Sequence, residues 1–309
     1  MENRTMVKQL LLSGLSDLPA LQFPLFLFFL LIYLLTLIWN LLIIVLIVTD
    51  SHLHVPMYFF LGNMASLDLC CSSVTVPRMV FDLYTRKRRI TIMACMTQFF
   101  FFFFFVASEA FLLAVMSYDR YMAICHPLHY IQTLSWKVCV RLVSIVLCLS
   151  FIYSFVHTFY ASKLTFCELD IIESFFCDLP QLLQISCSDI SINILLIFIL
   201  GGFFGGGCPV ITFLSYVYIF RTVLNIRGTR SKVFSTCTPH MTVLFLYYGS
   251  GFLNYFQLNS SHHFTSNKSA SVFYTVILPF LNPLIYSLRN QDIKAAFRDF
   301  VRKIIPNTM

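Results

Sequence analysis

Seven long apolar stretches decide what this chain can fold into. An α-helix rises about 1.5 Å per residue, so about 20 consecutive apolar residues cross the hydrocarbon core of a bilayer. Each stretch reaches that length, and the third contains seven consecutive phenylalanines, Phe99 to Phe105. The sequence therefore predicts spanning helices over 24–48, 56–82, 92–118, 140–162, 190–220, 233–258 and 269–288.

Composition supports an integral membrane protein. At 58% hydrophobic and 11% charged residues, a chain of 309 residues has too little polar surface to cover a soluble domain. A transmembrane barrel would show alternating segments of about ten residues, which the continuous Leu, Ile and Phe runs do not. The expected fold is an all-α membrane protein, a seven-transmembrane helix bundle.

The ends of the chain complete three expected segments. The first stretch begins near Pro24 with no small-residue cleavage site after it, so we expect it to be retained rather than removed as a signal peptide. Residues 1–23 form an N-terminal segment, 24–289 the bundle and 290–309 a tail. The tail predicts a short amphipathic helix on the inner leaflet, with Ile293, Phe297, Phe300, Val301 and Ile304 opposite Lys294, Arg298, Arg302 and Lys303.

Basic residues predict the orientation. Twelve lie on one face, which the positive-inside rule makes cytoplasmic: Arg120, Lys137, Arg141, Arg221, Arg227, Arg230, Lys232, Arg289, Lys294, Arg298, Arg302 and Lys303. The sequons at Asn3, Asn259 and Asn267 fall on the other face, and Asn3 is the candidate glycosylation site. We expect a multi-pass plasma-membrane protein with an extracellular N-terminus and a cytoplasmic C-terminus.

A basic cluster runs against that rule. The TRKRR segment, residues 85–89, lies on the outer face between the second and third stretches. The net charge of +7 is spread along loops beside the spans, where anionic lipid headgroups are the nearer partner. Membrane lipids are therefore expected partners, and nucleic acid is not.

Four cysteines lie where disulfides form. Cys167, Cys177 and Cys187 share one loop on the oxidising side, and Cys95 stands at the outer mouth of the third stretch. The sequence allows three pairings, and free thiols are the alternative. Bridges here would strap the loop at about 163–189 across the mouth of the bundle.

Four polar side chains fall near mid-membrane. An unpaired carboxylate there costs at least about 2.5 to 3.5 kcal/mol, so Asp68 and Glu109 must face the interior. Two nearby carboxylates favour a sodium-like cation or a shared proton, and simple hydrogen bonding is the alternative. Asn40 and Asn282 could complete the network or serve only as hydrogen bonds between helices.

Two further features suggest a switch near the cytoplasmic face. Asp119 and Arg120, in MSYDRYMAIC at 116–125, place an acid beside a base where an apolar run ends. In the seventh stretch, Pro283 frees a backbone carbonyl that neighbouring helices can satisfy, and the resulting kink can act as a hinge.

The outer halves of the stretches predict a ligand pocket with apolar walls and few hydroxyls, which suits a small, mostly hydrophobic ligand. No carboxylate occurs in the outer half of the third stretch, which disfavours a protonated amine. Such aromatic stripes are often only core. The candidate lining residues are Phe102, Phe103, Val106, Ala107, Leu200, Phe204, Gly251, Phe252, Tyr255, Val272, Thr275 and Val276.

Seven motifs occur in one order along the chain: LHVPMYFFL (53–61), SLDLC (66–70), VPRM (76–79), MSYDRYMAIC (116–125), PLHY (127–130), KVFSTCTPH (232–240) and PFLNPLIYSLRN (279–290). With these motifs the chain resembles an olfactory receptor, a rhodopsin-like G-protein-coupled receptor, over nearly its whole length. The resemblance implies a receptor for an odorant that has neither catalytic activity nor a cofactor.

The resemblance also implies residue roles. Cys95 would bridge to Cys177 and Cys167 to Cys187, while Asp68 and Glu109 would belong to an intramembrane polar site. Odorant binding would rearrange four residues and open the cytoplasmic face to a stimulatory G protein that raises cyclic AMP; these are Arg120, Tyr216, His240 and Tyr286. A non-olfactory receptor for a lipid-like ligand is the nearer alternative. A channel or transporter would predict internal repeats, which the sequence does not show.

Overall fold

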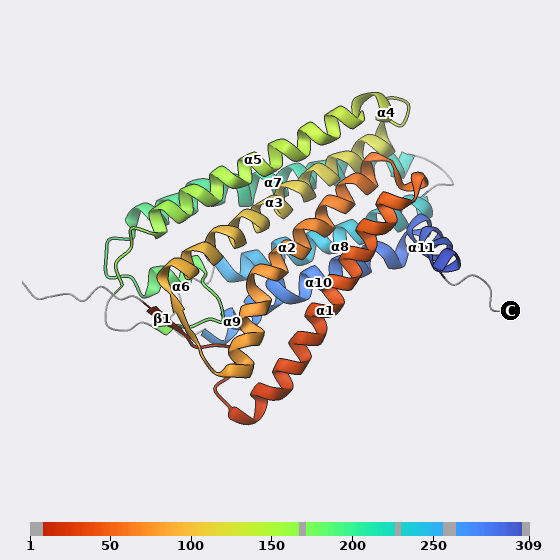
Figure 1. Ribbon diagram of the computed structural model, residues 1–309. Coiled ribbons are helices and arrows are strands. Elements are labelled where there is room, and N and C mark those ends of the chain that lie inside the picture. The colour runs from red at the N-terminus through yellow and green to blue at the C-terminus, as the bar shows by residue number, and fades with distance from the viewer. Residues whose placement is uncertain (1–8, 167–170, 226–229, 256–263, 305–309) are drawn as a thin grey trace, which may run out of the picture.

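The computed structural model describes residues 9–166, 171–225, 230–255 and 264–304. Long helices within these ranges run side by side as one bundle (Figure 1). They are α1 (Pro19–Thr49), α2 (Pro56–Thr85), α3 (Ile92–Cys125), α5 (Trp136–Ala161), α7 (Ser191–Asn225), α8 (Arg230–Tyr255) and a segment formed by α9 (Phe264–Val272), η2 (Phe273–Ile277) and α10 (Leu278–Arg289). The predicted seven-helix bundle is confirmed.

Six of these segments are long and apolar enough, within the described residues, to cross a membrane. The helix α8 is not among them because polar side chains interrupt its apolar sequence. Tyr247 and Tyr248 donate hydrogen bonds to α3, and His240 bonds to α7, so these groups are directed into the bundle rather than toward lipid. The helix α8 is assigned to the bundle by its length of 26 residues and its hydrogen bonds to α3 and α7, rather than by its mean hydropathy.

Helix ends differ from the predicted bounds by several residues. The helix α1 begins at Pro19 rather than Pro24, α3 continues to Cys125, and α5 begins at Trp136. Polar or aromatic residues near a membrane surface can extend a helix beyond its apolar stretch, so hydropathy underestimates these lengths. The seventh segment contains one π-helical turn, Phe273–Ile277, which a hydropathy pattern does not encode.

A small sheet, which the sequence did not predict, closes one end of the bundle. Its strands, in the order β2–β1–β3, are β2 (Arg89–Thr91), β1 (Gln9–Leu12) and β3 (Ile171–Ile172). The strand β1 pairs antiparallel with β2, with Leu10 opposite Ile90, and parallel with β3. We call this the sheet end.

Arg88 fixes the chain around that sheet. Its guanidinium donates to the carbonyls of Ser13 and Ser16 and pairs with Asp17 at 2.6 Å. Gly14 has a φ of +72°, and a Cβ there would lie 3.2 Å from the Arg88 guanidinium carbon. Glycine is therefore favoured at this position both by its backbone conformation and by the close approach of Arg88.

The opposite end carries η1 (Ser51–Leu53), α4 (Tyr130–Thr133) and α11 (Gln291–Ile304), and we call it the α11 end (Figure 1). The Asn290 side chain accepts hydrogen bonds from the N–H groups of Asp292 and Ile293, which caps α11. Ile293 is buried against the bundle, while Phe297 is 40% exposed. The predicted amphipathic helix is present, and it presents part of its apolar face outward.

Two apolar clusters fill the bundle, one toward each end. At the sheet end the core includes Phe99, Phe102 and Phe176; at the α11 end it includes Leu112, Met116 and Tyr216. A short helix, α6 (Leu179–Gln184), is also buried at the sheet end. The four predicted intramembrane polar residues lie along their helices between members of the two clusters, for example Asp68 between Leu67 and Cys71.

Candidate functional site

The structure brings Asp68 and Asn282 into direct contact at the centre of the bundle. The Asn282 amide nitrogen donates to both carboxylate oxygens of Asp68, at 2.9 and 3.2 Å. Both side chains are almost completely buried, at 1% and 2% exposed. A carboxylate in this position needs such a partner because water does not reach it.

Asn40 stabilises the seventh segment at its proline. Pro283 has no backbone N–H, so the carbonyl four residues earlier, that of Pro279, lacks its helical donor. The Asn40 amide donates to that carbonyl at 3.1 Å and to Thr36 of its own helix at 3.0 Å. A donor from α1 therefore satisfies the acceptor that Pro283 frees in α10, as the sequence led us to expect.

Glu109 is the second buried acid, at 3% exposed. The Cys71 thiol lies beside its carboxyl group, and the charges of Glu109 and Asp68 act on one another. The hydroxyl groups of Tyr247 and Tyr248 donate to the carbonyls of Val106, three residues before Glu109, and Ala110, the residue after it. These bonds hold α8 against the part of α3 that carries Glu109.

Among the described residues, one buried oxygen each of Glu109, Asn40 and Asn282 has no hydrogen-bond partner, and neither has the Tyr286 hydroxyl one turn further along α10. Two carboxyls with neighbouring amide oxygens form the hard donor set that a sodium-like cation takes. The same group could instead hold a shared proton. Within the described residues no group of three or more His, Cys, Asp or Glu side chains could hold a metal ion, so a cation here would depend on the amide oxygens.

A second cluster surrounds Arg120 toward the α11 end. The Tyr216 hydroxyl and the His240 ring nitrogen Nδ1 are hydrogen-bonded at 2.6 Å, and the ring of Tyr286 lies 6.4 Å from that of His240. Arg120 is close enough for its charge to act on all three. The structure thus brings together the four residues that the family resemblance implied.

Asp119 has a partner that the sequence did not reveal. Its carboxylate accepts a hydrogen bond from Tyr130 of α4 at 2.8 Å, and among the described residues it makes no ion pair with Arg120. Burial, together with the negative charge of Asp119, raises the pKa of Tyr130, so its hydroxyl remains a donor at physiological pH. Tyr130 belongs to the PLHY motif, which gave the only sequence signal for this contact.

The predicted pocket residues at the sheet end are closely packed. Phe102 and Phe103 are 1% and 5% exposed. Three further pocket residues are buried: Ala107, Thr275 and Val276. Four are partly buried: Val106, Leu200, Gly251 and Val272. The Thr275 hydroxyl is bonded to the Ser271 carbonyl at 2.6 Å. The side chains of Phe204, Phe252 and Tyr255 lie outside what the structure describes.

Aromatic residues that the sequence did not single out complete this cluster. Phe102 contacts Phe176 of the long loop and Tyr274 of η2, with ring centroids 5.0 and 5.9 Å apart. Tyr274 donates to the carboxylate of Asp178 at 2.9 Å, next to α6. Phe176 and Asp178 lie in a loop without periodicity, so only their nearness to Cys177 could have indicated them.

The long loop is anchored to α3. Cys177 forms a disulfide with Cys95, and its backbone N–H donates to the Gln98 side chain at 3.0 Å. Cys187 is also disulfide-bonded. Its predicted partner Cys167 and the sequon residues Asn3 and Asn259 lie outside the described residues, so the second pairing and the glycosylation remain predictions.

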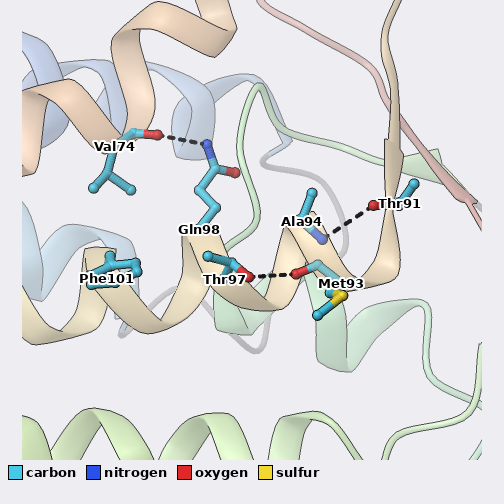
Figure 2. A pocket seen from close by; sticks show the side chains of 7 residues that line it. All are labelled: Val74, Thr91, Met93, Ala94, Thr97, Gln98 and Phe101. Atoms are coloured by element: carbon cyan, nitrogen blue, oxygen red, sulfur yellow. Dashed lines mark hydrogen bonds between the residues drawn. The ribbon is translucent and has the colours of Figure 1, made fainter.

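Two surface grooves of the described part lie outside the predicted pocket. A groove of about 540 Å³ is lined by residues of α2, β2 and α3, and these residues are drawn in Figure 2. A second groove, of about 560 Å³, lies against Ile44 of α1, Asn63 of α2 and Trp136 of α5. Neither contains a predicted ligand-binding residue.

A bundle of seven helices with buried polar residues, a long loop anchored to α3 by a disulfide and the Arg120 cluster at the opposite end defines a seven-helix receptor of the G-protein-coupled type. A family model for olfactory receptors matches residues 29–305, nearly the whole chain. The chain belongs to the olfactory receptor family.

Individual relatives agree with this assignment. Olfactory receptor 5B12 of Homo sapiens is 46% identical over 305 residues, covering 98% of this chain and 97% of the relative. Olfactory receptor 5AR1 of Mus musculus is 44% identical and covers 98% of each chain. Olfactory receptor 1C1 of Homo sapiens is 43% identical, covering 97% of this chain and 96% of the relative. Members of this family are G-protein-coupled receptors and not enzymes.

Proposed function

We propose that this receptor binds a small, mostly hydrophobic volatile in the sheet-end half of the bundle and activates a stimulatory G protein that raises cyclic AMP. The observation that carries the proposal is the position of the polar site. Asp68, Glu109, Asn40 and Asn282 separate the aromatic cluster from the Arg120 cluster. These four residues lie between the end that would bind the ligand and the end that would bind the G protein.

The walls favour an apolar ligand. The rings of Phe102, Phe103 and Phe176 contact one another within the sheet-end cluster, and the hydroxyls of Tyr274 and Thr275 already have hydrogen-bond partners. A ligand with several polar groups would find few partners here and would lose its hydration. A volatile molecule must separate these rings to enter, because they are closely packed.

The switch follows from the contacts of α8. Tyr247 and Tyr248 bond α8 to α3 near the predicted pocket, while His240 bonds it to Tyr216 of α7. Displacing α8 at the ligand end therefore strains the His240–Tyr216 bond at the other end. We expect this bond to break on activation, which would free Arg120 and open the α11 end to the G protein.

Orientation and the buried acids belong to the same proposal. The sheet end would face outward and the α11 end the cytoplasm, in the plasma membrane, as the basic residues predict. A sodium-like cation held by Asp68 and Glu109 would stabilise the closed arrangement by neutralising two buried carboxylates. Membership of the olfactory receptor family sets aside a transporter and a non-olfactory lipid receptor.

The test is a cyclic AMP assay in cells that express the full chain with an olfactory-type G protein and are exposed to a panel of volatiles. At least one volatile should raise cyclic AMP, and Arg120→Ala should abolish the response at equal surface expression. Lys137→Ala is the matched control, since Lys137 is an exposed cation near the same end that is not one of the four residues of the Arg120 cluster. A response that survives Arg120→Ala would overturn the proposed switch.

A further inference from the structure

The groove between α2 and α3 at the sheet end is lined by none of the residues that we predict to bind the odorant. Figure 2 shows Thr91, Met93, Ala94, Thr97 and Phe101 along one side of β2 and α3, with Val74 of α2 opposite. Met93 and Phe101 are 81% and 43% exposed, so this side of α3 faces away from the bundle. In a membrane it would face the acyl chains of lipids.

The groove is chemically suited to a hydrocarbon chain. Its polar side chains already have partners: Thr97 donates to the Met93 carbonyl, Thr91 accepts from the Ala94 N–H, and Gln98 donates to the Val74 carbonyl (Figure 2). The other Gln98 atom, the amide oxygen, accepts from the Cys177 N–H. An apolar chain can lie against these groups without leaving any of them unpaired.

The length of the groove corresponds to one leaflet. Met93, Thr97 and Phe101 lie four residues apart on one face of α3, and together they cover roughly 12 Å at about 1.5 Å per residue. The hydrocarbon core is about 30 Å thick, so one leaflet is roughly 15 Å deep. A chain that enters at Thr91 would therefore run along the groove nearly to the middle of the bilayer.

Exposed cations stand at the entrance. In β2, Arg89 and Thr91 are both exposed while Ile90 between them is buried, so Arg89 shares the face of Thr91, which lines the groove. Arg86 and Lys87 are also exposed. Within the described residues none of these three side chains has an ion-pair partner, whereas Arg88 is bonded to Asp17.

The cations are held in place by Arg78. Its guanidinium donates to the backbone carbonyls of Lys87 and Arg89 at 3.2 and 2.7 Å, and it pairs with Asp82. Arg78 therefore fixes the backbone of the basic segment against α2, one helical turn from Val74 of the groove. The positions of the free cations relative to the groove follow from these bonds.

We propose that this groove and the cations Arg86, Lys87 and Arg89 form a binding site for an anionic lipid of the leaflet at the sheet end. One acyl chain lies between Val74 and the Met93–Phe101 face, and the charged headgroup contacts the cations. This role accounts for a basic cluster on the face where the positive-inside rule does not predict one. It depends on neither the odorant nor the G protein.

The test is native mass spectrometry of the purified full chain in detergent with equal amounts of phosphatidylglycerol and phosphatidylcholine. We expect a severalfold preference for phosphatidylglycerol, weakened by added salt because the headgroup contacts are exposed. The triple change Arg86→Gln, Lys87→Gln, Arg89→Gln should remove the preference. Lys163→Gln, at another exposed cation near the sheet end, should retain it.

A second variant tests the groove separately from the charge. Thr97→Trp fills the groove on an exposed helix face and should lower retention of phosphatidylglycerol severalfold, while Ile152→Trp on the exposed face of α5 should not. Unchanged retention in either the triple variant or Thr97→Trp, with an unfolding midpoint like that of the native chain, would overturn the proposal. The proposal would also be overturned if glycerol phosphate, which has no acyl chain, bound as well as phosphatidylglycerol.

Discussion

At the scale of single residues, Asn40 supplies the hydrogen bond that Pro283 cannot. Replacing Asn40 by alanine would leave the Pro279 carbonyl buried without a donor, and we expect a loss of about 1 to 2 kcal/mol in the free energy of unfolding. Thermal unfolding of the purified receptor measures this. Asn63→Ala is the control, because among the described residues Asn63 donates only to the Phe59 carbonyl of its own helix. Equal losses in the two variants would show that the bond to Pro279 has no special role.

The buried acids make a second residue-scale prediction. If Asp68 and Glu109 hold a sodium-like cation, sodium chloride should raise the unfolding midpoint of the native chain relative to choline chloride. The variant Asp68→Asn should lose this dependence, since it removes one of the two carboxylates. A midpoint that follows pH but does not respond to sodium would mean that the two carboxyls share a proton.

The residue types of the site could be predicted, but several partners could not. Charges and amides stand out within apolar stretches because lipid makes them costly, and this identified Asn40, Asp68, Glu109 and Asn282. The Tyr130–Asp119 and Tyr274–Asp178 bonds join side chains 11 and 96 residues apart, and no periodicity encodes such distances. Their geometry depends on how helices and loops pack.

At the scale of elements, the disulfide between Cys95 and Cys177 holds the long loop over the bundle. The two cysteines are 82 residues apart in the sequence. Removing a native disulfide typically lowers the free energy of unfolding by about 2 to 5 kcal/mol. We expect Cys177→Ser to reduce surface expression strongly, measured by flow cytometry with an N-terminal tag. Cys148→Ser, at an exposed free cysteine, should express like the native chain. Similar expression of both variants would argue against an anchoring role.

Helices were predictable at this scale and the sheet was not. Long apolar stretches in lipid can satisfy their backbone only as helices or closed barrels, so the spans follow directly from composition. The strands β1, β2 and β3 have four, three and two residues, too few for an alternating pattern. They form because the loop and the N-terminal segment meet above the bundle, which is a property of the tertiary structure.

At the scale of the whole molecule, orientation is the property to establish first. With the sheet end outside, Asn3 should carry a glycan, so Asn3→Gln and peptide N-glycosidase treatment should produce the same increase in gel mobility. A C-terminal tag should be accessible to antibody only after permeabilisation. An accessible C-terminal tag on intact cells would reverse the proposed topology.

The central claim is that ligand binding at one end of the bundle activates a G protein at the other. The most direct measurement is volatile-stimulated nucleotide exchange on a purified stimulatory G protein, with the receptor in lipid nanodiscs. The account predicts faster exchange with the native receptor and basal exchange with Arg120→Ala. Volatile-evoked ion currents from the reconstituted receptor in the absence of any G protein, without stimulated exchange, would contradict it.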